Sequence, residues 1–105
     1  MFYEIRRETA VPGKGKELAR CMEDEVIPLH QSHGMTVVGS FVDADDEDVF
    51  VWIRKFAGAQ EREAIVENVH ADSRWSSTVG PAVVPLLAAD ATTVRLLPTP
   101  GSTLR

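Results

Sequence analysis

The chain has 105 residues, of which 44% are hydrophobic and 26% are charged, a composition that is typical of one globular domain and excludes wholesale disorder. The net charge of −5, with no stripe of Lys and Arg to offset it, excludes nucleic acid as an expected partner. The single cysteine, Cys21, excludes an internal disulfide, and no zinc-ligand spacing of Cys and His is present. We therefore expect neither a metal nor a cofactor.

The sequence also leads us to expect no targeting signal and no membrane-spanning segment. The first residues form a strand-like run and not a basic segment followed by an apolar stretch, so no signal peptide is expected. No apolar run is long enough to cross a bilayer. Together with the single cysteine, these features lead us to expect a cytoplasmic protein that does not associate with membranes.

The first third of the chain predicts a strand followed by a long helix. Residues 2–8 are rich in aromatic and branched side chains, and the Pro-Gly-Lys-Gly run at 12–15 ends this strand. From Lys16 to His33, apolar side chains recur three or four residues apart, which is typical of a helix with one buried face. These side chains are Leu18, Met22, Val26 and Leu29.

Two residues are expected to shape the C-terminal half of this helix. Pro28 lacks the amide hydrogen that a helix interior needs, and it predicts a kink near Asp24. Gly34 predicts the end of the helix, because glycine readily adopts the left-handed conformation found just beyond helix C-termini.

The middle of the chain predicts an antiparallel β-hairpin. Residues 35–42 and 49–56 have high β-propensity, and an acidic connector, residues 43–48, joins them. The connector lacks the glycine turn and the terminal bidentate Glu of a calcium-binding loop. A solvated hairpin tip is therefore the favoured interpretation.

The last third of the chain predicts one more helix and one more strand. The helix spans residues 60–70, and the strand spans residues 92–97. Between them, residues 72–85 are interrupted by Gly and Pro and are expected to be irregular or helical in short pieces. We expect one domain over residues 1–98 and an extended C-terminal tail over residues 99–105.

The predicted order of elements is strand, helix, strand, strand, helix, strand, which indicates an α+β, ferredoxin-like βαββαβ fold. In this fold the helices cover one face of a four-stranded antiparallel sheet. Strand 49–56, however, is apolar on both faces, and an exposed apolar face of this size is uncommon on a monomer. We therefore expect a homodimer in which the second faces of two sheets pack together, as in dimeric α/β barrels. The alternative is that residues 72–85 cover that face.

Short strings of residues along the chain resemble the NIPSNAP family. The strings are Phe2-Tyr3-Glu4-Ile5-Arg6, Val26-Ile27-Pro28, Gly34-Met35, Val38-Gly39-Ser40-Phe41, Val51-Trp52-Ile53-Arg54-Lys55-Phe56 and Arg95-Leu96-Leu97-Pro98. The resemblance implies a dimeric ferredoxin-like barrel, and it implies no catalytic residues. Related barrels include antibiotic-biosynthesis monooxygenases, haem-degrading enzymes and polyketide cyclases, but a shared fold does not establish a shared function.

A first set of candidate ligand-binding residues follows from strand parity. Glu4 and Arg6 share one face of the first strand, and Trp52, Arg54 and Phe56 share one face of the third. If both faces point toward the helices, these residues line a pocket with aromatic walls and fixed charges. Arginine is suited to carboxylate or phenolate ligands. The alternative is a Glu–Arg pair that seals a sheet edge or the dimer interface.

A second set of candidates consists of the histidines near the helix ends. His30 and His33 are neighbours on the first helix, and they either lean inward as a general base or haem ligand, or occupy the helix C-terminus because the helix dipole favours them there. The second interpretation is favoured, because metal sites usually have more ligands than the sequence supplies. The same alternatives apply to His70, which either approaches the cavity from the second helix or, as is more common, lies at the helix end. Trp75 is expected to anchor the irregular segment.

Three functions are compatible with these observations. The preferred one is a protein that binds a small apolar or aromatic molecule between helices and sheet. The second is a cofactor-independent monooxygenase or polyketide-cyclase-like enzyme, in which Arg54 stabilises an enolate or phenolate and His30 or His33 moves the proton. The third is a protein-interaction module with a closed core. The state of the cavity distinguishes the three.

Overall fold

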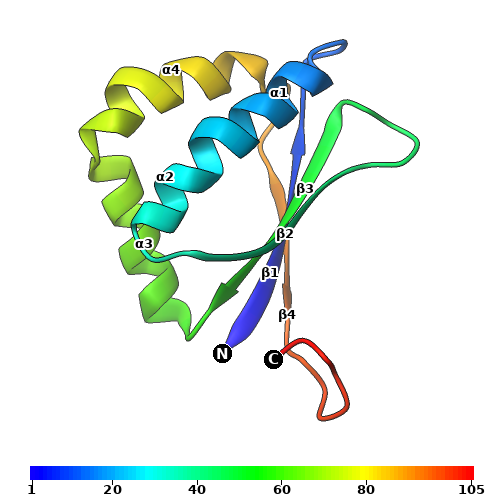
Figure 1. Ribbon diagram of the computed structural model, residues 1–105, viewed down its shortest axis with the longest axis vertical. Coiled ribbons are helices and arrows are strands. Elements are labelled where there is room, and N and C mark those ends of the chain that lie inside the picture. The colour runs from blue at the N-terminus through cyan, green and yellow to red at the C-terminus, as the bar shows by residue number, and fades with distance from the viewer.

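A computed structural model describes all 105 residues and shows a four-stranded antiparallel sheet with the helices on one of its faces (Figure 1). The strands are β1 (Phe2–Thr9), β2 (Thr36–Val42), β3 (Val49–Phe56) and β4 (Thr92–Leu96). They lie in the order β2-β3-β1-β4, so β1 and β3 occupy the centre. The predicted ferredoxin-like α+β fold is confirmed.

The first helical segment is one rod in three parts. It begins as α1 (Gly15–Cys21), continues through a π-helical turn (Met22–Val26) and ends as α2 (Ile27–Ser32). Pro28 lies just after the π-helical turn, so its missing amide hydrogen falls where the regular α-helical hydrogen bonding is already interrupted. The sequence predicts a kink near Asp24, and the structure has a π-helical turn at that position.

The connections around the hairpin are held by close backbone contacts. Gly34, with φ of +92°, ends the helical rod as predicted. Within the acidic connector, the Asp48 carboxylate accepts hydrogen bonds from the amides of Gly13 and Gly15, at 3.1 and 3.0 Å. A Cβ atom added at Gly15 would lie 1.8 Å from the carbonyl oxygen of Glu47. The hairpin tip is thus also a docking point for the start of α1.

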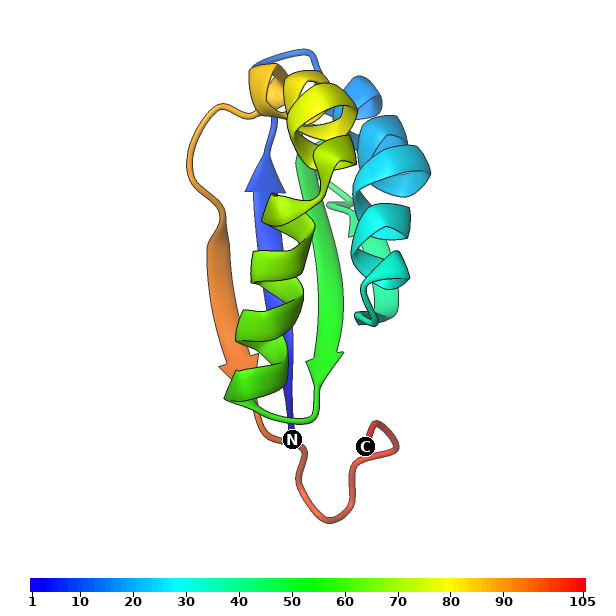
Figure 2. The same cartoon turned by 90° about the vertical axis from the view of Figure 1, so that its left-hand side faces the viewer.

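The second helical region runs along the same face of the sheet (Figure 2). It consists of α3 (Ala59–Ala71), a π-helical turn (Trp75–Val79), α4 (Gly80–Val83) and a single 3₁₀ turn (Val84–Leu86). Val79 and Val83 are buried in the core between these helices and the sheet. The alternative that residues 72–85 cover the opposite face of the sheet is therefore wrong.

The core lies between the sheet and the helices. Along β3, Phe50, Trp52 and Phe56 point toward the helices and are at most 2% exposed. They pack in one cluster with Met22 of the helical rod and Val69 of α3. Because side chains alternate along a strand, Val51 and Ile53 point to the other face and stay half-exposed.

The outer face of the sheet remains apolar and partly open. Phe41 and Val94 are each 55% exposed, and Ile53 lies between their strands. The C-terminal tail turns back at Thr99, whose carbonyl accepts a hydrogen bond from the amide of Ser102, and borders a groove at one end of this face (Figure 1). The tail therefore covers only that end.

None of the helices combines the length and the apolar character that crossing a bilayer requires.

Candidate functional site

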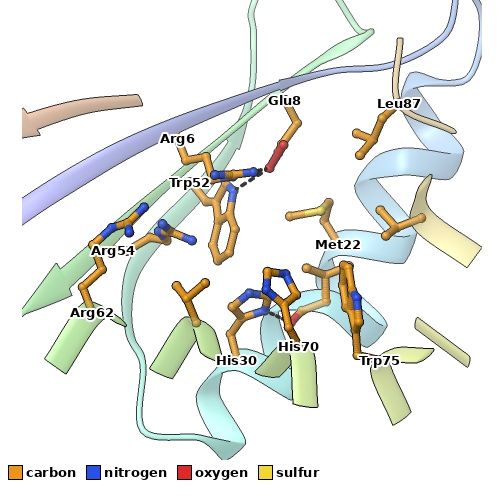
Figure 3. Close-up of a pocket in the computed structure, with 13 residues that line it drawn as sticks. Arg6, Glu8, Met22, His30, Trp52, Arg54, Arg62, His70, Trp75 and Leu87 are labelled. Atoms are coloured by element: carbon orange, nitrogen blue, oxygen red, sulfur yellow. Dashed lines mark hydrogen bonds and ion pairs between the residues drawn. The ribbon is translucent and has the colours of Figure 1, made fainter. Parts of the chain in front are cut away.

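The helix-covered side of the sheet contains a cavity of about 110 Å³ (Figure 3). Both central strands, the helical rod, α3 and the segment after it contribute walls. The polar lining residues are Arg6, Glu8, His30, Arg54, Arg62 and His70. Apolar surface comes from Met22, Trp52 and Trp75, among others. An apolar wall with a few fixed polar groups is the usual construction of a small-molecule site.

One corner of the cavity is fixed by Glu8. Its side chain is buried, and one carboxylate oxygen accepts hydrogen bonds from the Trp52 indole at 3.2 Å and from Arg6 at 3.0 Å. The indole N–H of a buried tryptophan needs such an acceptor. Glu8 therefore holds both the Trp52 ring and the Arg6 guanidinium in place.

A second corner is organised by Glu4, which lies behind the lining. Glu4 accepts hydrogen bonds from Arg54, directly opposite on β3, and from Arg62 of α3, whose Nε lies 2.9 Å away. Burial acts to raise the pKa of the Glu4 carboxyl, but the hydrogen bonds from Arg62 and Arg54 outweigh it and leave this pKa below its usual value. The Glu4 carboxylate is therefore charged at neutral pH.

Arg54 combines a charged head with an aromatic surrounding. The carbon at the centre of its guanidinium lies 4.8 Å from the centre of the Trp52 ring and 5.5 Å from that of Phe56. Burial lowers the pKa of Arg54, and the hydrogen bond to Glu4 opposes this change. Only 2% of the residue is exposed, and its Nε has no hydrogen-bond partner. An unpaired buried donor of this kind is uncommon in folded proteins.

His30 is buried and lines the cavity, so the favoured interpretation of it as a partly exposed helix-end histidine is wrong. Its Nδ1 donates a hydrogen bond to the carbonyl oxygen of Val26 at 2.7 Å, since a carbonyl can only accept. The ring meets Trp52 edge-on, with 5.3 Å between the ring centres. Burial lowers the pKa of His30 to about 4, so the neutral ring leaves Nε2 as an acceptor. No protein group hydrogen bonds to that nitrogen.

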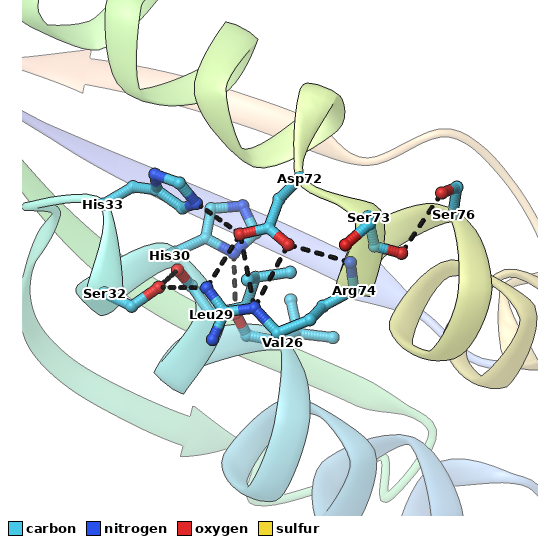
Figure 4. A network of polar contacts seen from close by, with 9 residues as sticks. All are labelled: Val26, Leu29, His30, Ser32, His33, Asp72, Ser73, Arg74 and Ser76. Atoms are coloured by element: carbon cyan, nitrogen blue, oxygen red, sulfur yellow. Dashed lines mark hydrogen bonds and ion pairs between the residues drawn. The ribbon is translucent and has the colours of Figure 1, made fainter.

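His33 lies at the C-terminal end of α2 and does not line the cavity. Its Nε2 lies 2.8 Å from the Asp72 carboxylate, which also binds Arg74, and Arg74 reaches Ser32 (Figure 4). This network joins the end of α2 to the segment that follows α3. His33 is therefore the partly exposed histidine at the helix C-terminus that the sequence favours, and the alternative inward position is wrong because the ring turns to Asp72.

The structure divides the predicted site residues into two groups. Arg6, His30, Trp52 and Arg54 line the cavity. The remaining three do not: Glu4 stands behind the arginines, Phe56 is buried in the core, and His33 lies outside.

Sequence reasoning missed two charged lining residues. Glu8 continues the parity of Glu4 and Arg6 on the first strand, so its inward position could have been found by extending that pattern. Arg62 stands four residues before Val66 and eight before His70, a spacing that places all three on one helical face. The charge of Arg62 conceals this pattern from a search for apolar periodicity.

The fold and the cavity define an α+β protein with a pocket between its sheet and its helices, and comparison with known proteins identifies the family. The NIPSNAP family model matches residues 3–102, and the chain belongs to the NIPSNAP family. A NIPSNAP family protein of unknown function from Agrobacterium tumefaciens is 29% identical, with a TM-score of 0.88, over 100% of this chain and 94% of that one. No curated protein matches the sequence.

More distant structures share the fold. An uncharacterised NIPSNAP domain protein from Burkholderia xenovorans is 22% identical, with a TM-score of 0.85, over 97% of this chain and 98% of its own. A structure described as an antibiotic biosynthesis monooxygenase is 18% identical, with a TM-score of 0.68, over 95% of this chain and 100% of its own. At these identities the similarity concerns the fold alone.

Proposed function

We propose that the protein binds a small apolar or aromatic molecule in the cavity between helices and sheet. The observation that supports this function is the composition of the cavity, in which aromatic and aliphatic walls surround a few fixed polar groups. Its volume of about 110 Å³ is smaller than the cavity of about 150 Å³ that holds benzene in another protein, so a ligand of one ring would extend through the open side of the pocket. An interaction module with a closed core would have no such space.

The binding function is tested by filling the cavity. Val66 is partly buried and lines the cavity, whereas Ala64 is exposed on the same helix and does not. Toluene and phenol serve as probes, and the NMR resonance of the Trp52 indole N–H reports their entry. We expect saturable shifts in the wild type and in the Ala64→Phe control, and their loss in Val66→Phe. Absence of saturable shifts with both probes in the folded wild type would contradict the proposal.

A second candidate function is a cofactor-independent oxygenase or cyclase. It is supported by the position of Arg54 and His30 on the same cavity, where one could stabilise an enolate or phenolate and the other accept a proton. The pKa of His30, about 4, makes it a weak base at neutral pH, which favours binding over catalysis. Oxygen uptake with phenol or hydroquinone, abolished in His30→Gln, would favour the enzyme.

We also propose that the outer face of the sheet packs against a second copy of the chain. Phe41, Val94 and Leu96 are 55%, 55% and 42% exposed, and monomeric proteins rarely leave a contiguous apolar face of this kind in water. Neither the helices nor residues 72–85 lie on this face, and the tail covers one end of it. Two flat sheets of this type pack well face to face.

The dimer is tested by sedimentation equilibrium. The wild type is expected at twice the chain mass of 11.5 kDa, and Phe41→Glu is expected to be monomeric because it places a charge within the apolar contact. Val84 is 57% exposed in the helical segment on the other side of the sheet, and Val84→Glu is the matched control. A folded monomeric wild type at high micromolar concentration would contradict the proposal.

A further inference from the structure

The charges around the cavity are unbalanced. Three arginines line it, and they share two carboxylates: Arg6 pairs with Glu8, while Arg54 and Arg62 both pair with Glu4. The count leaves one positive charge without a counter-charge, although the whole chain has a net charge of −5. A positive wall inside an acidic protein is a local feature of the site, and it attracts one negative charge.

A further cation stands nearby and increases the imbalance. Arg95 of β4 lies 4.0 Å from the same Glu4 carboxylate, and its side chain is 52% exposed. Solvent screens this group more than it screens Arg54, whose side chain is 3% exposed. The electrostatic effect of the surplus charge is therefore strongest at the buried Arg54.

Arg54 also retains unused hydrogen-bonding capacity. Its Nη2 is bound to Glu4, but its buried Nε has no acceptor. A buried cationic donor without a partner is unfavourable, and a ligand oxygen beside the guanidinium would remove this penalty. The guanidinium fork suits the two coplanar oxygens of a carboxylate.

His30, in contrast to Arg54, needs a hydrogen-bond donor from the ligand. Because its Nδ1–H is committed to the Val26 carbonyl, the free Nε2 of the neutral ring can only accept a hydrogen bond. Both groups contact the Trp52 ring: the His30 ring is nearly perpendicular to it, and the Arg54 guanidinium lies over its face. A single ring carrying an acceptor group and a hydroxyl donor would satisfy both groups while resting on Trp52.

From this arrangement we infer that the natural ligand is a small aromatic monocarboxylate that carries a hydroxyl group, with its carboxylate at Arg54 and its hydroxyl at His30. This inference rests on the proposed binding function and specifies its ligand class. A phosphate ester carries about −1.5 to −2 at neutral pH. This exceeds the one surplus charge of the residues that line the cavity, because Arg95 does not line it and is screened by solvent. A simple phenol, with a pKa of about 10, is neutral under the same conditions and leaves the surplus positive charge of the cavity uncompensated.

The inference is tested by calorimetric titration of the wild-type protein with four kinds of probe. The probes are toluene, benzamide, benzoate and the three isomers of hydroxybenzoate. Benzamide has the shape of benzoate without its charge. We expect benzoate to bind at least about tenfold more tightly than benzamide, and the best hydroxybenzoate isomer to bind more tightly again.

Variants identify the groups responsible. Arg54→Met should remove most of the preference for benzoate over benzamide. Arg62→Met should reduce this preference and leave the core intact, because the Arg62 side chain is more exposed. His30→Phe should remove the preference for hydroxybenzoate over benzoate. Arg20→Gln, which removes one exposed charge from α1, should leave both preferences unchanged. If Arg54→Met does not fold, as judged by circular dichroism, Arg62→Met carries the test of the charge.

The outcomes separate the two proposals. Binding of toluene and benzamide as tight as that of benzoate would overturn the carboxylate inference and leave the binding function intact. Equal affinity for benzoate and every hydroxybenzoate would overturn the part assigned to His30. Absence of binding by all probes would overturn the inference together with the proposed function.

Discussion

Glu4 and Arg54 lie directly opposite each other on β1 and β3, and they form an ion pair in which each side chain is only 3% exposed. The pair connects the two central strands at the level of the cavity. Its carboxylate also holds Arg62 of α3, so one buried side chain orients charged groups from a neighbouring strand and from a helix. The wall of the cavity and the stability of the fold are therefore linked through Glu4.

The first prediction concerns the replacement Glu4→Gln. Removing one partner of a buried pair leaves an uncompensated charge, so we expect the free energy of unfolding to fall by about 3 kcal/mol. Urea denaturation followed by circular dichroism measures this loss. Glu17 forms an exposed pair with Lys14, and Glu17→Gln should cost no more than about 0.5 kcal/mol. Equal stability of the two variants would show that the buried pair is unimportant.

The second prediction concerns the pH dependence that His30 confers. The pKa of His30 is about 4 in the folded protein and 6.5 ordinarily, so the unfolded chain binds the proton more readily. Its contribution to stability is complete above the ordinary value and is lost as the pH falls toward about 4. The loss relative to His30→Gln should be on the order of 3 kcal/mol. Denaturation at several pH values measures it.

A direct titration provides the control for this prediction. The ring protons of His30, followed by NMR in the native protein, should shift near pH 4. Protonation of His30 near its ordinary value would mean that the ring is hydrated and not buried against Trp52.

Most of the fold could be predicted from local patterns. The strand at residues 49–56 was predicted with its observed bounds because its β-propensity is high along its whole length. The helical turns between Trp75 and Leu86 were not resolved from sequence, since Gly and Pro interrupt the periodicity there. Contacts of Val79 and Val83 with the distant core stabilise these turns, and such contacts leave no local signal.

The candidate site was predictable as far as strand parity reaches. Parity grouped Arg6 with Glu4 and Trp52 with Arg54 on shared strand faces, but only the structure shows that these faces point to the helices and that Arg6, Trp52 and Arg54 line the cavity. Strand parity does not apply to helices, and helical spacing could not decide between His30 and His33, because the two are close neighbours in one turn. The deciding partner, Asp72, is 39 residues from His33 in the chain and is brought to it only by folding.

The third prediction concerns Asp72. Hydrogen bonds from Arg74, and then from His33, hold the pKa of its carboxyl below the ordinary value of 3.8. Its stabilising effect is therefore present above that value and is lost as the pH falls through the lower pKa of the folded state. We expect Asp72→Asn to be less stable than wild type at neutral pH, with the difference vanishing in strong acid. Asp90→Asn, at an exposed position, is the control.

The fourth prediction tests the close approach of the hairpin tip to the start of α1. A Cβ atom at Gly15 would lie 1.8 Å from the backbone oxygen of Glu47, and neither backbone can move without disturbing the hydrogen bond from Gly15 to Asp48. Gly15→Ala should therefore cost more than about 2 kcal/mol, because the clash involves main-chain atoms.

The matched control for this prediction is Gly58→Ala. Gly58 precedes α3 in an extended conformation, with φ of 179°, and an added Cβ would meet no atom within 4 Å. This replacement should leave stability unchanged or raise it slightly, because alanine restricts the unfolded chain. Thermal unfolding of the two variants side by side measures the difference. A Gly15→Ala protein as stable as Gly58→Ala would show that the tip does not pack on α1 as described.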